Sequence, residues 1–150
     1  MIPATIDRVQ VNTDEDINQE IRRRTEKSIE RAATGGPAAI ERRLAELDVE
    51  WDIERYLETM APTFTLLGLT LGLTRNRAWF ILPLVVQTFF LQHALQGWCP
   101  PIPVLRRMGV RTYGEIEGER YALKALRGDF RNVVSGLAND TQAACEAVRR

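Results

Sequence analysis

The sequence contains few of the residues that build metal centres or disulfide frameworks, with two cysteines and one histidine among 150 residues. Two cysteines cannot form a disulfide framework, and one histidine leaves too few soft ligands for a His/Cys metal site. An excess of charge of either sign is also absent, because 20 Lys and Arg balance 20 Asp and Glu. Whole-chain charge therefore gives no reason to expect nucleic acid or another polyanion as a partner.

Motifs for catalysis and nucleotide binding are missing as well. The sequence has no Gly-rich phosphate loop followed by Lys and Ser or Thr, no Gly-x-Gly-x-x-Gly and no His-Glu-x-x-His. Carboxylate pairs such as Glu115 and Glu119 fall on a strongly charged predicted helix, where solvation is the default interpretation. We expect no enzyme activity, no metal and no cofactor.

Charge itself is missing from two long stretches, Thr59–Thr74 and Ala78–Leu105. As helices, segments 57–74 and 78–98 would span about 27 and 31 Å, against roughly 30 Å of hydrocarbon in a bilayer. Ten strongly apolar residues in the second segment contribute on the order of −3 to −6 kcal/mol to insertion. The first segment has fewer and would insert marginally alone. The ten are Phe80, Ile81, Leu82, Leu84, Val85, Val86, Phe89, Phe90, Leu91 and Leu95.

Aromatic residues typical of a membrane interface flank both segments. Trp79 and Trp98 bound the second segment, and Tyr56 precedes the first. The alternative is a soluble helical bundle, but a buried helix of a small domain usually keeps one polar face, and segment 79–91 has none. The pattern therefore predicts a transmembrane helical hairpin.

The connection Thr74–Arg77 is so short that the two helices must be adjacent and antiparallel. Both termini then lie on one side of the membrane. More arginines flank the hairpin on that side than occupy the connection, which favours cytoplasmic termini. The flanking arginines are Arg42, Arg43, Arg55, Arg106, Arg107 and Arg111, against Arg75 and Arg77 in the connection.

Helices are predicted before the hairpin. Acidic residues after Thr13 favour a helix start, and Gly35 and Gly36 favour its end near Ala33. Pro37 suits the first turn of a second helix. That helix places an apolar seam at Ile40, Leu44, Leu47 and Trp51. No proline or glycine separates this second helix from the hairpin, so one continuous helix could run into the bilayer. Residues 1–12 are expected to be disordered or extended.

Helices are also predicted after the hairpin, so the fold class is all-α: a two-helix transmembrane hairpin flanked by amphipathic helices on both sides. Prolines within 100–103 predict an extended exit along the interface, followed by short helix 104–108. Further helices are expected over 113–126 and from Asp140 or Thr141. The expected organisation is an N-terminal helical cytoplasmic segment 1–56, the hairpin 57–98 and a C-terminal helical cytoplasmic segment 99–150.

The hairpin exit carries a recognisable pattern. Gly97-Trp98-Cys99-Pro100 is followed by Leu105 and by Gly109-Val110-Arg111-Thr112. The block from Arg55 to Thr112 resembles the YgaP-like transmembrane domain family (DUF2892). The resemblance implies an integral membrane protein, here expected in a bacterial inner (plasma) membrane, that can form a homodimer. Some relatives carry a rhodanese sulfurtransferase domain, which we do not expect here because the sequence has no Cys-centred anion loop.

Cys99 is the candidate thiol site. Because it follows Trp98, we expect it at the membrane interface, with Arg106 and Arg107 near enough to stabilise a thiolate. Those conditions would lower the thiol pKa from its usual value of about 8.5. The alternative is a small residue that fits a tight turn before Pro100.

Two further residue sets lie within the predicted membrane segments. Gln92, Gln96 and Cys99 fall at i, i+4 and i+7, with His93 beside them, so the second helix is predicted to carry an intramembrane polar face. Interhelical hydrogen bonding is the favoured interpretation of this face, and a small polar site is the alternative. In the first helix, Gly68-x-x-x-Gly72 favours close helix packing, either within the hairpin or in a homodimer through helix 57–74.

Three function classes remain open. The favoured one is a membrane-anchored structural or interaction protein, with the lipid bilayer as its environment and a cytoplasmic protein as its partner. The second is a thiol-based sulfur or redox carrier that uses Cys99, suggested by family analogy. The third is a transport accessory that uses the Gln/His face, and it requires oligomers because one hairpin is too thin to make a pore.

Overall fold

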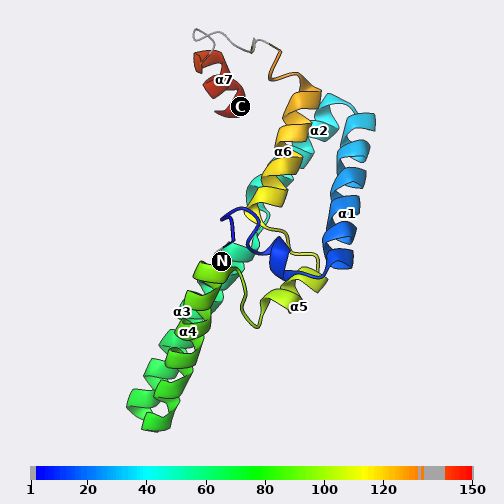
Figure 1. Ribbon diagram of the computed structural model, residues 1–150. Coiled ribbons are helices and arrows are strands. Elements are labelled where there is room, and N and C mark those ends of the chain that lie inside the picture. Colours follow the sequence, from blue (N-terminus) through cyan, green and yellow to red (C-terminus); the bar gives the residue numbers. More distant parts are fainter. Residues whose placement is uncertain (1–2, 132, 134–140, 150) are drawn as a thin grey trace. The chain divides into compact units, whose positions relative to one another are not determined.

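The computed structural model describes residues 3–131, 133 and 141–149 (Figure 1). Every regular element in those residues is helical, which confirms the predicted all-α class. The elements are η1 (Gln10–Asn12), α1 (Glu15–Thr34), α2 (Pro37–Val49), α3 (Ile53–Thr74), η2 (Arg77–Phe80), α4 (Ile81–Gln96), α5 (Ile102–Arg107), α6 (Tyr113–Arg127) and α7 (Thr141–Arg149).

The chain divides into two compact units that do not follow its order. The first combines residues 1–22 with 51–114, and the second combines 23–50 with 115–150. This division differs from the expected 1–56, 57–98 and 99–150, because segments far apart in sequence share a core. In the first unit, Val9 packs with Ile53 of α3 and Ile102 of α5 in one buried cluster.

Helices α3 and α4 of the first unit pack side by side as an antiparallel pair (Figure 1). The turn between them is capped at Asn76, whose Oδ1 accepts a hydrogen bond of 2.9 Å from the N–H of Ala78. The chain then makes the 3-10 turn η2 before α4 begins. Helix α4 ends at Gln96, and the next residue, Gly97, has a φ of 78°, the left-handed conformation that favours glycine.

Helix α2 does not run on into α3, so the continuous helix that the sequence allowed is not formed. The backbone is extended at Glu50, and Asp52 caps a new helix by accepting a 2.7 Å hydrogen bond from the N–H of Arg55. Trp51 lies in the break between α2 and α3, so it is not part of the apolar seam that was predicted for the second helix. Trp51 as a whole is 39% exposed, and the guanidinium carbon of Arg55 lies over its ring, 4.5 Å from the centroid.

The N-terminal segment is folded, so the expectation that residues 1–12 are disordered or extended is wrong for the described residues 3–12. Val9 is buried in the core of the first unit. The Nδ2 of Asn12 donates hydrogen bonds of 2.8 Å to the carbonyls of Arg8 and Gln96, which ties the segment to the end of α4.

The chain after the hairpin forms a helix earlier than predicted. The prolines were expected to keep it extended, but α5 begins at Ile102, directly after Pro101. Pro103 is accommodated because it lies in the first helical turn, where its missing N–H costs no hydrogen bond. The N–H of Ile53 donates to the carbonyl of Arg111 at 2.9 Å, which joins the start of α3 to the chain after α5.

The second unit has its own core. Ile40, Leu44 and Leu47 form the buried face of α2, as predicted, and pack with Ala32 of α1 and with α6. The α6 residues of this cluster are Ile116 and Leu123. The apolar seam of α2 is therefore covered by other helices of the same chain.

A buried carboxylate accompanies this core, so the solvated position expected for Glu119 is wrong. Glu119 of α6 is completely buried and accepts hydrogen bonds of 2.8 and 3.1 Å from Nε and Nη2 of Arg43 on α2. This contact raises the pKa of the Arg43 guanidinium. The charge of Glu119 is thereby neutralised by a bidentate partner, as a buried carboxylate requires.

Candidate functional site

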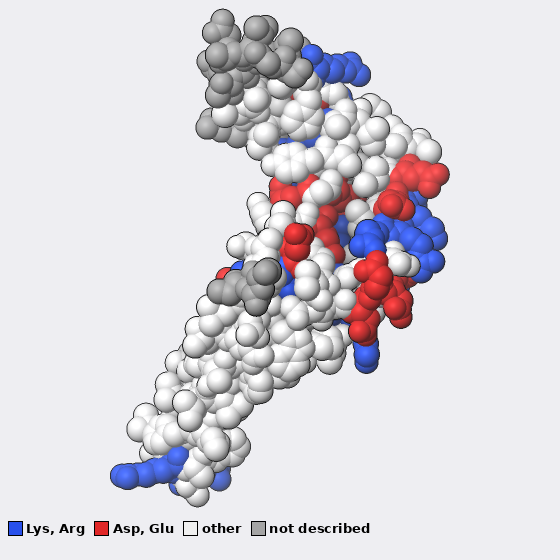
Figure 2. All heavy atoms as spheres, in the orientation of Figure 1, with Lys and Arg blue, Asp and Glu red and all other residues white. Residues whose placement is uncertain are grey.

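The outward surface of the hairpin is apolar and exposed. Within the described residues, Arg77–Gln96 is the one stretch long and apolar enough to cross a membrane, and only 11% of it is buried. Figure 2 shows the visible face of the hairpin without charge until its far end, where Lys or Arg side chains appear. The exposed large apolar residues include Leu66, Leu67, Leu69 and Leu73 of α3 and Ile81, Leu84, Leu91 and Leu95 of α4.

Hydroxyl groups on the hairpin bond to their own helices. Each donates to the carbonyl one turn earlier at 2.7–2.8 Å, so no protein partner or water is needed to satisfy the donor. These residues are Thr59, Thr63, Thr70 and Thr74 of α3 and Thr88 of α4. A polar contact also joins α3 and α4, because Nε2 of Gln87 donates a hydrogen bond of 2.8 Å to Oγ1 of Thr65.

Gly68 and Gly72 lie where α3 approaches the second half of the hairpin most closely. A methyl group added at Gly68 would collide with the ring of Pro83 on α4. One added at Gly72 would lie 2.6 Å from Cε1 of Phe80. Of the two uses left open by the sequence, the structure shows packing within the hairpin, and a homodimer would need another face.

We predict that Gly68→Ala destabilises the protein in detergent, because the Pro83 ring is rigid and the backbones must separate. Gly118→Ala on α6 is the matched control. Nothing lies within 4 Å of the methyl group that it would add, so it should stabilise α6 by up to about 1 kcal/mol. The measurement is denaturant unfolding followed by circular dichroism. Equal stabilisation by both substitutions would contradict close packing at Gly68.

The residues of the predicted polar face of α4 differ in burial. Gln92 is half-buried and Gln96 is exposed, whereas His93 is 3% exposed. Cys99 is not on this face, because α4 ends at Gln96 and the left-handed Gly97 turns the chain away. The expectation of one continuous face is therefore wrong for Cys99.

His93 is buried near two partly buried charged residues, Arg8 and Glu54, a grouping that no pattern in the sequence indicates. Its ring stacks on Phe90 with centroids 6.5 Å apart, and neither ring nitrogen has a hydrogen-bond partner among the described residues. The Arg8 guanidinium acts on it electrostatically and pairs with Glu54 of α3 at 3.3 Å. Three distant segments thus bring an imidazole, a guanidinium and a carboxylate to the end of the hairpin.

Cys99 is buried rather than exposed at an interface, so that expectation is wrong. It is 3% exposed and packs in the core of the first unit with Leu57 and Ile102. Burial raises the pKa of its thiol to about 11, although a backbone hydrogen bond from Ile102 offsets part of this effect. Arg106 does not serve the thiol as expected, because its guanidinium donates to Oδ1 of Asn18 at 2.8 Å.

In a Cys145→Ser variant, Cys99 should alkylate slowly at pH 8, and its rate should rise about tenfold per pH unit until the pKa of about 11 is approached. Iodoacetamide kinetics across pH 7–11 measure this profile. The unfolded protein in denaturant is the control and should titrate near the model-peptide value of about 8.5. A folded-state pKa below that value would restore Cys99 as a reactive thiol.

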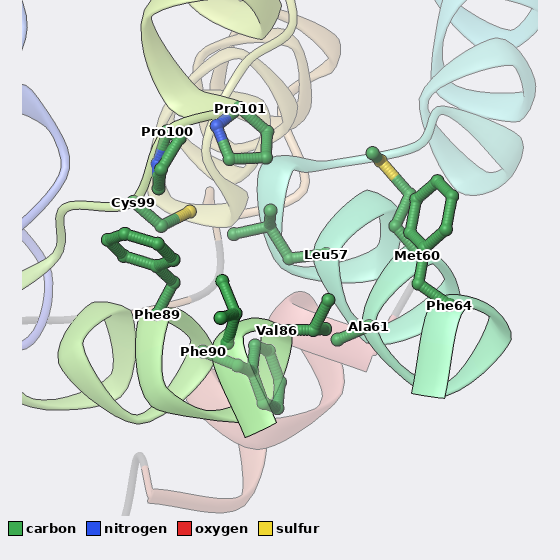
Figure 3. A pocket seen from close by; sticks show the side chains of 11 residues that line it. Leu57, Met60, Ala61, Phe64, Val86, Phe89, Phe90, Cys99, Pro100 and Pro101 are labelled. Carbon is green, nitrogen blue, oxygen red and sulfur yellow. The ribbon is translucent and has the colours of Figure 1, made fainter. Parts of the chain in front are cut away.

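An apolar groove lies beside Cys99, with a volume of about 180 Å³ (Figure 3). One wall comes from α3 and the other from α4, and Cys99, Pro100 and Pro101 also line it. Leu57, Met60, Ala61 and Phe64 of α3 recur at i, i+3, i+4 and i+7, a spacing visible in the sequence. The facing residues of α4 are Val85, Val86, Phe89 and Phe90.

Comparison with known proteins gives no further guide: no family model matches the chain, and neither a curated protein nor a solved structure is significantly similar to it. The resemblance to the YgaP-like family therefore rests on the apolar hairpin and its exit pattern in the sequence. What the described residues offer chemically is an apolar hairpin, an apolar groove and, at the end of the hairpin, the partly buried pair of Arg8 and Glu54 near the buried His93.

Proposed function

We propose that the chain is an integral membrane protein whose α3–α4 hairpin crosses the bilayer and anchors its remaining helices as a structural or interaction module. The observation that carries the proposal is the low burial of Arg77–Gln96, at 11%. A core helix of a soluble protein can be equally apolar, but it is mostly buried. Leaving the exposed side chains of α4 in water would cost about 25 cal/mol for each Å² of apolar surface.

Helix α3 does not itself qualify as a membrane span, and its insertion depends on α4. It carries Glu54, Arg55 and Glu58 near its start and Pro62 further along. Close packing at Gly68 and the hydrogen bond between Thr65 and Gln87 support insertion of the two helices as a pair. In this proposal Arg75 and Arg77 lie at the far interface.

The proposal includes an orientation in the membrane and two kinds of protein partner. The arginine distribution favours cytoplasmic termini, and the family resemblance favours a bacterial inner membrane. The charged surfaces of the second unit are then available to a cytoplasmic protein partner, and the outward hairpin faces to a second copy. The alternative of a thiol-based carrier is disfavoured because Cys99 is buried and its pKa is raised.

We predict that Asn76→Cys, in the connection, reacts with a membrane-impermeant maleimide in intact cells. The control is Cys145 in the unsubstituted chain, which is exposed on the protein but should react only after the cells are permeabilised. The opposite pattern would invert the topology. Release of the protein by alkaline carbonate would remove the membrane assignment itself.

A further inference from the structure

The groove beside Cys99 is elongated along the hairpin. Its α3 wall extends from Leu57 to Phe64, which is about 10 Å along the helix axis. The antiparallel α4 wall runs from Phe90 back to Val85. In the close-up, the Cys99 sulfur and the rings of Pro100 and Pro101 lie beside these walls (Figure 3). The shape suits a linear apolar ligand.

Water is a poor occupant of this groove. The side chains that line it are aliphatic, aromatic or sulfur-containing, so a water molecule would find few hydrogen-bond partners. An engineered apolar cavity of about 150 Å³ stays dry and binds benzene, which sets the scale for a space of this size. Left empty, the lining atoms would forfeit their dispersion contacts.

The groove opens onto the apolar outer surface of the hairpin. Phe64 of α3 and Val85 of α4 both line it, and both are also among the exposed large apolar residues. The groove and the outward surface are therefore continuous. In a hairpin that crosses a bilayer, a groove parallel to the helices is aligned with the lipid chains, whereas one side chain of a second copy would fill only part of its length.

We infer that this groove binds one acyl chain of a bilayer phospholipid. The inference rests on the proposed function, because only a membrane-inserted hairpin presents the groove to lipid. An acyl chain in the groove supplies the dispersion contacts that Leu57, Ala61 and Phe90 lack when the groove is empty, and it covers Cys99. The buried thiol then acts as part of a lipid-binding wall.

The test uses the full chain in detergent micelles, titrated with a phosphatidylcholine that carries a diazirine in one acyl chain. After illumination, crosslinked peptides are mapped by mass spectrometry. We expect crosslinks at Met60, Phe89 or Cys99 that saturate at about one lipid per chain and that unlabelled phosphatidylcholine displaces. This competition experiment uses the unsubstituted protein, so its result is valid even if a substitution disturbs folding.

Ala61→Phe fills the groove and should lower this crosslinking about tenfold, because a few methylene groups lose their contacts. Val86→Phe fills it from the opposite wall and should act alike. Ala94→Phe, on an exposed position of α4, is the matched control and should change nothing.

Non-saturable crosslinks spread over Leu66, Leu84 and Leu91 would overturn the inference, as would groove crosslinks that Ala61→Phe leaves unchanged. A crosslink between two copies of the chain through the groove would assign it to a dimer instead and would also overturn it. Carbonate extraction separates the two proposals. Protein that stays in the membrane but lacks groove crosslinks refutes only the lipid site, whereas protein released by carbonate refutes both.

Discussion

Apolar side chains cover α4 on every side, and α3 can shield only one of those sides. The shielding is as close as the backbone permits, because Gly68 lies against Pro83 and Gly72 against Phe80. The remaining surface, including Leu84 and the other exposed residues, has no cover in the described part of the chain. In the function that we propose, a bilayer supplies that cover, and α3, which is less apolar, is inserted together with α4.

Polar contacts gather at both ends of the hairpin. At the connection, Asn76 caps the turn and arginines flank it. At the other end, Asn12 bonds the carbonyl of Gln96, and the ion pair between Arg8 and Glu54 lies near His93. Polar groups thus collect where the apolar surface stops, while the hydroxyls within the hairpin bond to their own helices.

Local patterns in the sequence predicted the helices well, because apolar periodicity, glycine and proline act over a few residues. The break before α3 was missed although Asp52, with Glu54 two residues later, is an ordinary helix-start signal. The fold of residues 3–12, the ion pair of Arg8 with Glu54 and the electrostatic effect of Arg8 on His93 all join distant segments, and a single sequence does not reveal such pairings. The burial of Cys99 was misjudged for the same reason, since Val9, Ile53 and Ile102 share its core.

The most direct measurement of the central claim is the depth of α4 in a bilayer. A nitroxide attached at Leu84, which is 68% exposed, should be accessible to oxygen and protected from a water-soluble nickel chelate when the protein is reconstituted in vesicles. A nitroxide at the exposed Gln19 of α1 is the aqueous control and should show the reverse. Strong nickel-chelate accessibility at Leu84, equal to that at Gln19, would show that the apolar face of α4 lies in water and would contradict the membrane hairpin.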